Sequence, residues 1–149
     1  MSGRLTHAAL RALDRVNRAL LPKSKRAEHL QTGRRGEEDA YFYLRRQGYV
    51  MVARNWRSPR RKGELDLIGY DGDTLCFVEV KTRTTMDVKP AEAAVDQEKR
   101  HDLSAVAREY LRRLPQHPAH RFDILSIYYL GDGGKLPQFA LFKNCFPLS

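Results

Sequence analysis

Residues 63–81 read GELDLIGYDGDTLCFVEVK. Two apolar-rich runs around an Asp-Gly turn are typical of a β-hairpin. Side chains alternate between the faces of a strand, so Glu79 and Lys81 share one face. A two-residue turn at 71–72 places Asp66 opposite Phe77, and a turn at 72–73 places it opposite Glu79. In both registers Asp66 lies on the face that carries Glu79 and Lys81.

Two acids and a lysine on one face of a buried hairpin call for an explanation, because an unpaired buried ion costs several kcal/mol. One explanation is structural: an ion pair of Lys81 with Glu79 or Asp66, or an edge face that is open to water. The other explanation is a metal site. Hard cations such as Mg²⁺ bind carboxylate oxygens, and a nearby lysine can steady a nucleophilic water or a developing oxyanion.

Asp66 with Glu79-Val80-Lys81 resembles the split acid and Glu-x-Lys motif of the PD-(D/E)XK nuclease superfamily. A wider ordered set of fragments is similar to the bacterial UPF0102 family, also called YraN, which is regarded as related to the archaeal Holliday-junction resolvases. The fragments are Gly33-Arg34-Arg35-Gly36-Glu37, Asn55-Trp56-Arg57, Gly63 to Ile68, Phe77 to Arg83, and Arg121-Phe122-Asp123. The resemblance covers roughly residues 33–130.

The resemblance implies a metal-dependent endonuclease that acts on DNA, including branched or junction DNA. In that role Asp66 and Glu79, with the Val80 carbonyl, would hold Mg²⁺ or Mn²⁺, and Glu37 would be the family's first acid. Lys81 would orient the attacking water. A non-catalytic nucleic-acid-binding factor, an RNA nuclease and an accessory protein bound to a partner are the alternatives. Because two-fold junctions suit two active sites, the resemblance also implies a homodimer.

The chain has 149 residues, a hydrophobic content of 42% and a formal net charge of +9. This composition predicts one globular domain with a core and an anionic partner. The charge is concentrated at the start, because residues 1–35 hold nine Lys/Arg against two acids, a net +7, and leave about +2 for the rest. No run predicts a membrane helix or a signal peptide. Cys76 and Cys145 form no metal motif, so a cytoplasmic location is expected.

Residues 1–32 are predicted to be a basic amphipathic extension before an endonuclease-like domain of residues 33–149. Thr6 can cap a helix with leucines on one side and arginines on the other. Such a helix can contact DNA, act as a membrane-surface or targeting segment, pack on the core or a partner, or remain a partly ordered, solvated extension. Residues 22–26 are predicted to be a linker.

A helix is predicted over residues 34–47, ended by Gly48. Its apolar face contains Ala40, Tyr43 and Leu44, and at 100° per residue Glu37 falls on that face. Glu37 is therefore the acid of this helix expected to face the interior, although pairing with the helix N-terminus is an alternative role.

A strand over residues 49–56 leads into a loop that carries four cations, which are Arg57, Arg60, Arg61 and Lys62. A short basic loop is often only solvated, but this one adjoins Glu64 and Asp66. Contact with phosphate is therefore the alternative interpretation. Arg83, at the end of the hairpin of residues 64–83, is predicted to bind phosphate as well.

Pro90 is predicted to open a long helix that ends near Leu114. Lys99 falls on its buried stripe, where it either snorkels or reaches the hairpin acids or a phosphate. Strands are predicted over residues 122–130 and 139–142, with Asp123 paired to Arg121 or acting as a cap. This order of elements predicts an α/β fold with a mixed β-sheet flanked by helices. Such a fold fits the restriction-endonuclease-like core that the resemblance implies.

Overall fold

The computed structural model describes residues 23–84, 95–131 and 136–148, and contacts between residues divide the chain between Arg34 and Arg35. The elements in chain order are α2 (Lys23–Arg46), β1 (Val50–Arg57), β2 (Glu64–Asp71), β3 (Thr74–Arg83), α3 (Gln97–Arg112), β4 (His120–Tyr128) and β5 (Gln138–Phe146). The helix predicted to begin near Thr6 lies outside the described residues, as does Pro90.

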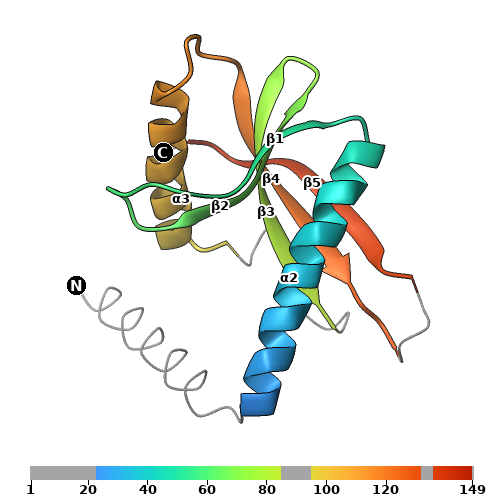
Figure 1. Cartoon of the computed structure of the whole chain (residues 1–149). Coiled ribbons are helices and arrows are strands. Elements are labelled where there is room, and N and C mark those ends of the chain that lie inside the picture. The colour runs from blue at the N-terminus through green and yellow to red at the C-terminus, as the bar shows by residue number, and fades with distance from the viewer. Residues whose placement is uncertain (1–22, 85–94, 132–135, 149) are drawn as a thin grey trace. The chain divides into compact units, whose positions relative to one another are not determined.

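One five-stranded sheet in the order β1-β2-β3-β4-β5 forms the centre of the fold (Figure 1). β3 and β4 are parallel, and the other neighbouring pairs are antiparallel. A parallel pair needs a crossover connection, and α3 lies in that connection. The predicted α/β class is therefore confirmed, and the mixed sheet with its two helices is consistent with a restriction-endonuclease-like core.

The hairpin adopts the second of the two registers weighed above. Asp71 pairs with Thr74 and Leu67 with Val78, so the turn is Gly72-Asp73. Gly72 has a φ of 59°, a left-handed conformation that glycine adopts without a Cβ clash. Carried one residue further, the same register places Asp66 opposite Glu79.

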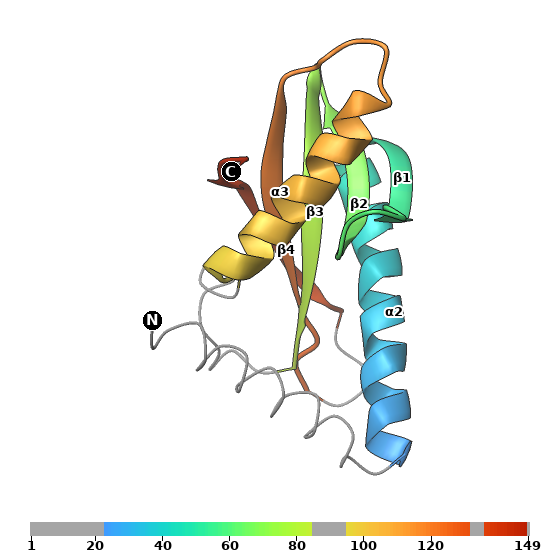
Figure 2. The ribbon, with the colours of Figure 1, turned by 90° about the vertical axis from the view of Figure 1, so that its left-hand side faces the viewer.

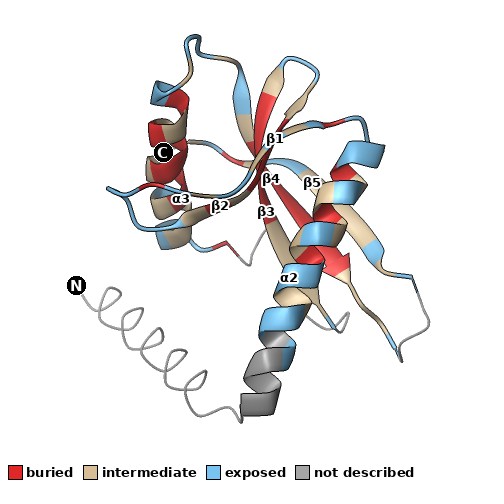
Figure 3. Cartoon of the chain, viewed as in Figure 1, coloured by how far each residue is buried: buried red, intermediate tan, exposed pale blue. Residues whose placement is uncertain are grey.

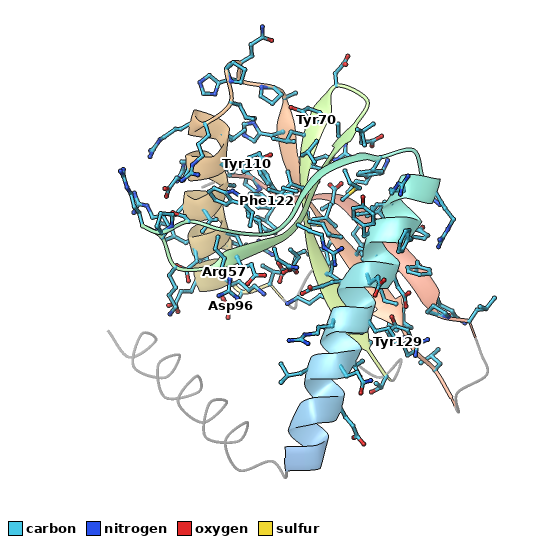
Figure 4. The ribbon with its side chains drawn as sticks, viewed as in Figure 1. Arg57, Tyr70, Asp96, Tyr110, Phe122 and Tyr129 are labelled. Atoms are coloured by element: carbon cyan, nitrogen blue, oxygen red, sulfur yellow. The ribbon has the colours of Figure 1, made fainter. Side chains whose placement is uncertain are left out.

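Two apolar clusters fill the core, one on each face of the sheet. Figure 2 shows how α3 and α2 lie against the sheet, and Figure 3 shows which segments are buried. The α3-side cluster joins α3 to residues that include Ile68, Phe77 and Ile124. Its rings pack closely, with Phe77 5.3 Å from Phe122 and 6.0 Å from Tyr110 between centroids. Figure 4 labels Tyr110 on α3 and Phe122 on β4. The α2-side cluster joins Ala40 and Leu44 to the opposite face. The three central strands, β2, β3 and β4, are therefore buried on both faces over part of their length.

Several element bounds differ from the prediction. α2 begins at Lys23, so the linker predicted over residues 22–26 is wrong for residues 23–26, three of which are good helix formers and none of which is proline. α3 begins at Gln97 because Asp96 is extended and its carboxylate accepts the Lys99 amide at 2.8 Å, an N-cap that a start at Pro90 would not allow. β5 is also longer than residues 139–142.

A buried charged network lies on the α2-side face around Asp123, which is 0% exposed. Its Oδ1 accepts from Arg121 Nε at 2.8 Å and from the Asn144 amide at 3.0 Å, and its Oδ2 accepts from the Tyr49 hydroxyl at 3.2 Å. Arg121 also donates to Asp71 Oδ2 at 2.6 Å. The predicted pairing of Asp123 with Arg121 is confirmed, and the network ties β4 to β2, β5 and the start of β1.

Candidate functional site

The α3-side face of the hairpin is apolar near its turn and charged at its open end. Leu75 and Phe77 of β3 belong to the α3-side cluster, and alternation continues this face with Glu79 and then Lys81. Asp66 of β2 lies beside them, because its carboxylate interacts with that of Glu79. The structure therefore brings the two predicted metal ligands and the predicted catalytic lysine together where α3 begins.

Glu79 is the centre of this group and is only 6% exposed. Lys99 Nζ of α3 donates to Glu79 Oε1, and Lys81 Nζ lies 3.4 Å from the same oxygen. The Asp96 cap fixes the first turn of α3 and so directs Lys99 toward the sheet. Of the two predicted alternatives for Lys99, the structure shows that it reaches the hairpin acids; phosphate binding by this lysine stays a prediction.

Asp66 accepts a hydrogen bond at 2.9 Å from the Val80 amide, beyond the last backbone pair of the hairpin. Burial and the neighbouring Glu79 carboxylate raise the pKa of Asp66 to about 8. Burial also lowers the pKa of Lys81, an effect that the Lys99 cation strengthens. Burial acts to lower the pKa of Lys99 too, but Glu79 outweighs it and the pKa is raised. The metal-free site thus disfavours a full negative charge on both acids.

This donor set fits a magnesium ion with two protein carboxylates. Within residues 23–84, 95–131 and 136–148, no group of three or more His, Cys, Asp or Glu side chains could hold a metal ion. Mg²⁺ is commonly bound through one or two carboxylates, with water and substrate phosphate completing the octahedron. Asp66 and Glu79 can supply the two carboxylates, and a cation beside them would favour the ionised form of Asp66. The Val80 carbonyl as a further ligand stays a prediction.

Ser126 supports a polar occupant at the same place. It pairs with Lys81 in the parallel ladder, lies on the face of Ile124, and is 0% exposed. Its hydroxyl oxygen has no hydrogen-bond partner in the part of the chain that the structure describes. A buried hydroxyl without a partner is unfavourable unless water or a ligand satisfies it, so this position beside Lys81 suits a bound polar group.

We expect Asp66→Asn to stabilise the protein at pH 8 when a chelator removes metal ions. The folded pKa is raised to about 8, whereas an unfolded aspartate titrates at about 3.9. Between these values the folded state binds the extra proton, so wild-type stability falls as pH rises from about 4 to about 8. Asparagine keeps an oxygen for the Val80 amide and removes this dependence.

Urea unfolding across that pH range measures the effect, with the exposed Asp73→Asn as the matched control. A wild type whose stability changes with pH no differently from that of Asp66→Asn would contradict the assignment of a neutral Asp66.

Glu37 enters the site from α2, and the helix approaches the end of β3 closely at the preceding residue. A Cβ added at Gly36 would lie 2.8 Å from Thr82 Oγ1, so only glycine allows this approach without displacement. With its amide nitrogen turned toward the acids, Asn55 donates to Glu37 Oε2 and Glu64 Oε1, each at 3.0 Å. Burial, Glu64 and Glu79 raise the pKa of Glu37. Glu37 therefore lies close enough to Glu79 for their charges to interact, and it accepts a hydrogen bond from Asn55.

The basic loop after β1 separates into two parts. Arg57 is paired with Glu64, with Nε 2.7 Å from Oε2, so this arginine is engaged within the protein. Arg60, Arg61 and Lys62 are exposed to solvent. Arg83 is half-buried at the end of β3. Phosphate binding by these five cations stays a prediction, and for Arg57 it would require exchange of the Glu64 partner.

The comparisons with known proteins identify the family at this point. The model of the "Uncharacterised protein family UPF0102" matches residues 36–127, which is more than half of the chain. The chain belongs to the UPF0102 family. The match contains all the predicted site residues from Glu37 to Lys99, so the charged end of the hairpin lies within the UPF0102 region.

UPF0102 relatives cover most of the chain. A UPF0102 protein of Koribacter versatilis (strain Ellin345) is 54% identical over 144 residues, which are 97% of this chain and 96% of that protein. One of Solibacter usitatus (strain Ellin6076) is 48% identical over 118 residues, 78% and 84% of the two chains. One of Porphyromonas gingivalis is 41% identical over 122 residues, 82% and 88%. These names state no activity, so a function has to be argued from the site.

Sequence reasoning missed four residues of this region: Asn55, Ser58, Glu109 and Ser126. Asn55 stands in a UPF0102-like fragment, and its φ of 50° is a conformation that asparagine tolerates better than most residues. Glu109 follows Val106 at helical spacing on the buried side of α3, which could have marked it. Ser58 and Ser126 carry no comparable signal, because a buried serine is common in packed structures.

Also within the described residues, no helix is both long enough and apolar enough to span a membrane.

Proposed function

We propose that this protein is a metal-dependent endonuclease of the PD-(D/E)XK superfamily that cleaves phosphodiester bonds in DNA, including branched or junction DNA. The observation that carries the proposal is the grouping of Asp66, Glu79 and Lys81 on one hairpin face, with Lys99 donating to Glu79. Two acids for a hard cation and a cation for a developing negative charge are the groups that phosphodiester hydrolysis requires.

Each side chain has a defined task in this mechanism. Asp66 and Glu79 hold Mg²⁺ or Mn²⁺, which when bound supplies Lewis-acid stabilisation and a more acidic water. Lys81 orients the attacking water and stabilises the charge that develops on the phosphate. Lys99 positions Glu79 and contacts phosphate when the substrate enters. Glu37 reaches the acid pair through water, held in place by Asn55.

A cleavage panel tests the proposal with Mg²⁺ or Mn²⁺ and with duplex, flap, junction and single-stranded substrates, each as DNA and as RNA. We expect metal-dependent cleavage of DNA by the wild type, loss of it in Asp66→Asn, and full retention in the exposed turn variant Asp73→Asn. Cleavage that is unchanged in Asp66→Asn would assign the activity to another site, and cleavage of RNA alone would replace DNA as the substrate.

Metal binding can be measured on the same proteins without substrate. A ligand present at 100 times its dissociation constant adds about 2.7 kcal/mol to the free energy of unfolding. We therefore expect millimolar Mg²⁺ or Mn²⁺ to raise the melting temperature of the wild type but not of Asp66→Asn. An unchanged wild-type melting temperature would count against a preformed metal site.

A second candidate function, a non-catalytic nucleic-acid-binding protein, is favoured by one observation. Glu79 is already engaged by two lysines, and the described residues contain no group of three or more His, Cys, Asp or Glu side chains that could hold a metal ion. Tight binding without cleavage across the whole panel would favour this candidate.

The proposed setting of the activity is the cytoplasm, where Cys76 and Cys145, both free thiols, would stay reduced. A homodimer follows from the resemblance alone and stays a prediction.

A further inference from the structure

The loop between β1 and β2 is fastened to α3 by a buried clasp. Ser58 and Glu109 are 8% and 9% exposed, and Ser58 Oγ donates to Glu109 Oε2. Ser58 Oγ in turn accepts the Arg60 amide at 3.0 Å and the Arg61 amide at 3.2 Å. The hydroxyl is thus fully used, and it holds the backbone of two consecutive arginines. The buried carboxylate of Glu109 therefore fixes the conformation of this loop, which a loop that is only solvated would lack.

The other end of this loop is held against the same helix. Gly63 has a φ of 114°, and a Cβ added there would lie 3.5 Å from Val106 Cγ2 and 4.0 Å from Asp102 Cβ. Positions 102, 106 and 109 follow one another along one side of a helix. The loop of residues 58–63 therefore runs along α3 and is fixed at both ends.

The loop exposes its cations to solvent, whereas Glu109, the acid that holds the loop, is buried. Arg60, Arg61 and Lys62 are exposed, as is Arg112 at the end of α3. The Arg113 guanidinium lies 5.0 Å over the Trp56 ring and 3.8 Å from Glu109 Oε1, with 55% of its side chain exposed. Glu109 is buried and paired with Arg113, and Glu64, which follows the loop, is paired with Arg57. Half-buried Asp102 also lies beside the loop. We call residues 58–63 with Arg112 and Arg113 the clasp surface.

The clasp surface and the acid pair of Asp66 and Glu79 lie at different positions along α3. From Lys99, which contacts Glu79, to Arg113 there are fourteen residues, about 21 Å of helix at 1.5 Å per residue. Duplex DNA advances about 3.4 Å per phosphate along each strand, so this span corresponds to about six base pairs. A duplex that lies along α3 with one phosphate at Glu79 would place its flank beside the clasp surface.

Aromatic rings near the clasp surface are not available for unpaired bases. Trp56 packs against Tyr110 at 5.2 Å between centroids, edge to face, and Arg113 lies over the Trp56 ring. Single-stranded nucleic acid is usually held by bases stacked on open aromatic faces, whereas a duplex is held by cations on its phosphates.

We propose that the clasp surface binds the phosphates of a double-stranded arm of nucleic acid next to the cleavage position. The nucleic-acid substrate rests on the function proposed above, but the surface itself does not depend on cleavage. Ser58 and Glu109 are positioning residues in this arrangement, because they act through the arginines that they hold.

Equilibrium binding of the full chain to a duplex and to one of its single strands, in Ca²⁺ to prevent cleavage, tests this proposal. Arg61→Ala combined with Arg112→Ala removes two cations of the clasp surface. The control is Arg45→Ala with Arg46→Ala, which removes the same charge from exposed residues at the end of α2. Two lost phosphate contacts lower the slope of log affinity against log salt by about 1.8. We expect this change for the duplex in the first pair and none in the control, with weaker binding of the single strand by the wild type.

Ser58→Ala tests the clasp, because it leaves every cation in place. We expect a several-fold loss of duplex affinity at a temperature where the variant is folded, and recovery in Ser58→Thr. Equal slopes for the two arginine pairs, or wild-type duplex affinity in Ser58→Ala, would overturn the proposal. If the wild type binds the duplex with the expected slope but cleaves nothing, the clasp surface stands and the endonuclease proposal fails.

Discussion

We expect Lys81→Met to lower the single-turnover cleavage rate by about 10²–10³-fold, the loss that follows when one preorganised stabiliser of transition-state charge is removed. Affinity for nucleic acid stays within a few-fold, because the lysine acts mainly when charge develops on the phosphate. The Lys81 side chain is only 17% exposed, and methionine replaces its length without its charge. Glu79 keeps its hydrogen bond from Lys99, so the fold of the hairpin is retained.

Single-turnover kinetics at saturating enzyme, together with equilibrium binding in Ca²⁺, separate these two quantities. Lys62→Met, on the exposed loop, is the matched control and should cleave at the wild-type rate once substrate is saturating. Lys99→Met is the informative companion, since it should weaken binding more than it slows cleavage. A wild-type rate in Lys81→Met would mean that the hairpin is not the active site, and the reverse pattern for the two lysines would exchange their roles.

We expect Asp123→Ala to destabilise the protein by about 3–5 kcal/mol, the usual cost of removing one partner of a buried ion pair. Asp123 is 0% exposed, and its removal leaves the Asn144 amide without its acceptor and Arg121 without its closest carboxylate in β4. For a chain of this size, each kcal/mol lowers the melting temperature by about 2–4 °C. The expected decrease is therefore roughly 6–20 °C.

Urea denaturation followed by circular dichroism measures this loss. Asp73→Ala, in the exposed hairpin turn, should change stability by no more than about 0.5 kcal/mol. Asp123→Asn keeps the shape and should lose less than the alanine variant. If Asp123→Ala unfolds within 1 kcal/mol of the wild type, roughly the error of the method, then the network does not stabilise the fold as argued.

Alternation along two strands was enough to predict that Asp66, Glu79 and Lys81 share one face. The helical stripe that contains Lys99 gave contact with the hairpin acids as one alternative, and the structure shows that contact with Glu79. These inferences succeeded because side-chain direction repeats with the backbone. The start of α3 was missed because proline and aspartate both favour a helix start. Only the hydrogen bond from the Lys99 amide to Asp96 decides between them.

Contacts between distant residues could not be predicted in this way. Ser58 and Glu109 are 51 residues apart, and Tyr49 and Asp123 are 74 apart. Each of these contacts depends on how separate elements pack and on where the β-bulges of β1 and β4 lie. No local sequence pattern determines these features. The same holds for Asn55, whose amide meets two acids from different elements.

The hairpin, its two possible registers and its charged face follow from local periodicity, because strand geometry alone sets which side chains lie together. Packing in three dimensions decided the rest: the register with Asp66 opposite Glu79, the hydrogen bond from Lys99 to Glu79, and the loop fixed on α3. These features depend on distances between elements, and burial then alters the charges, as the raised pKa of Asp66 shows. A residue's place on a strand is a local property, whereas its neighbours and its protonation are properties of the folded chain.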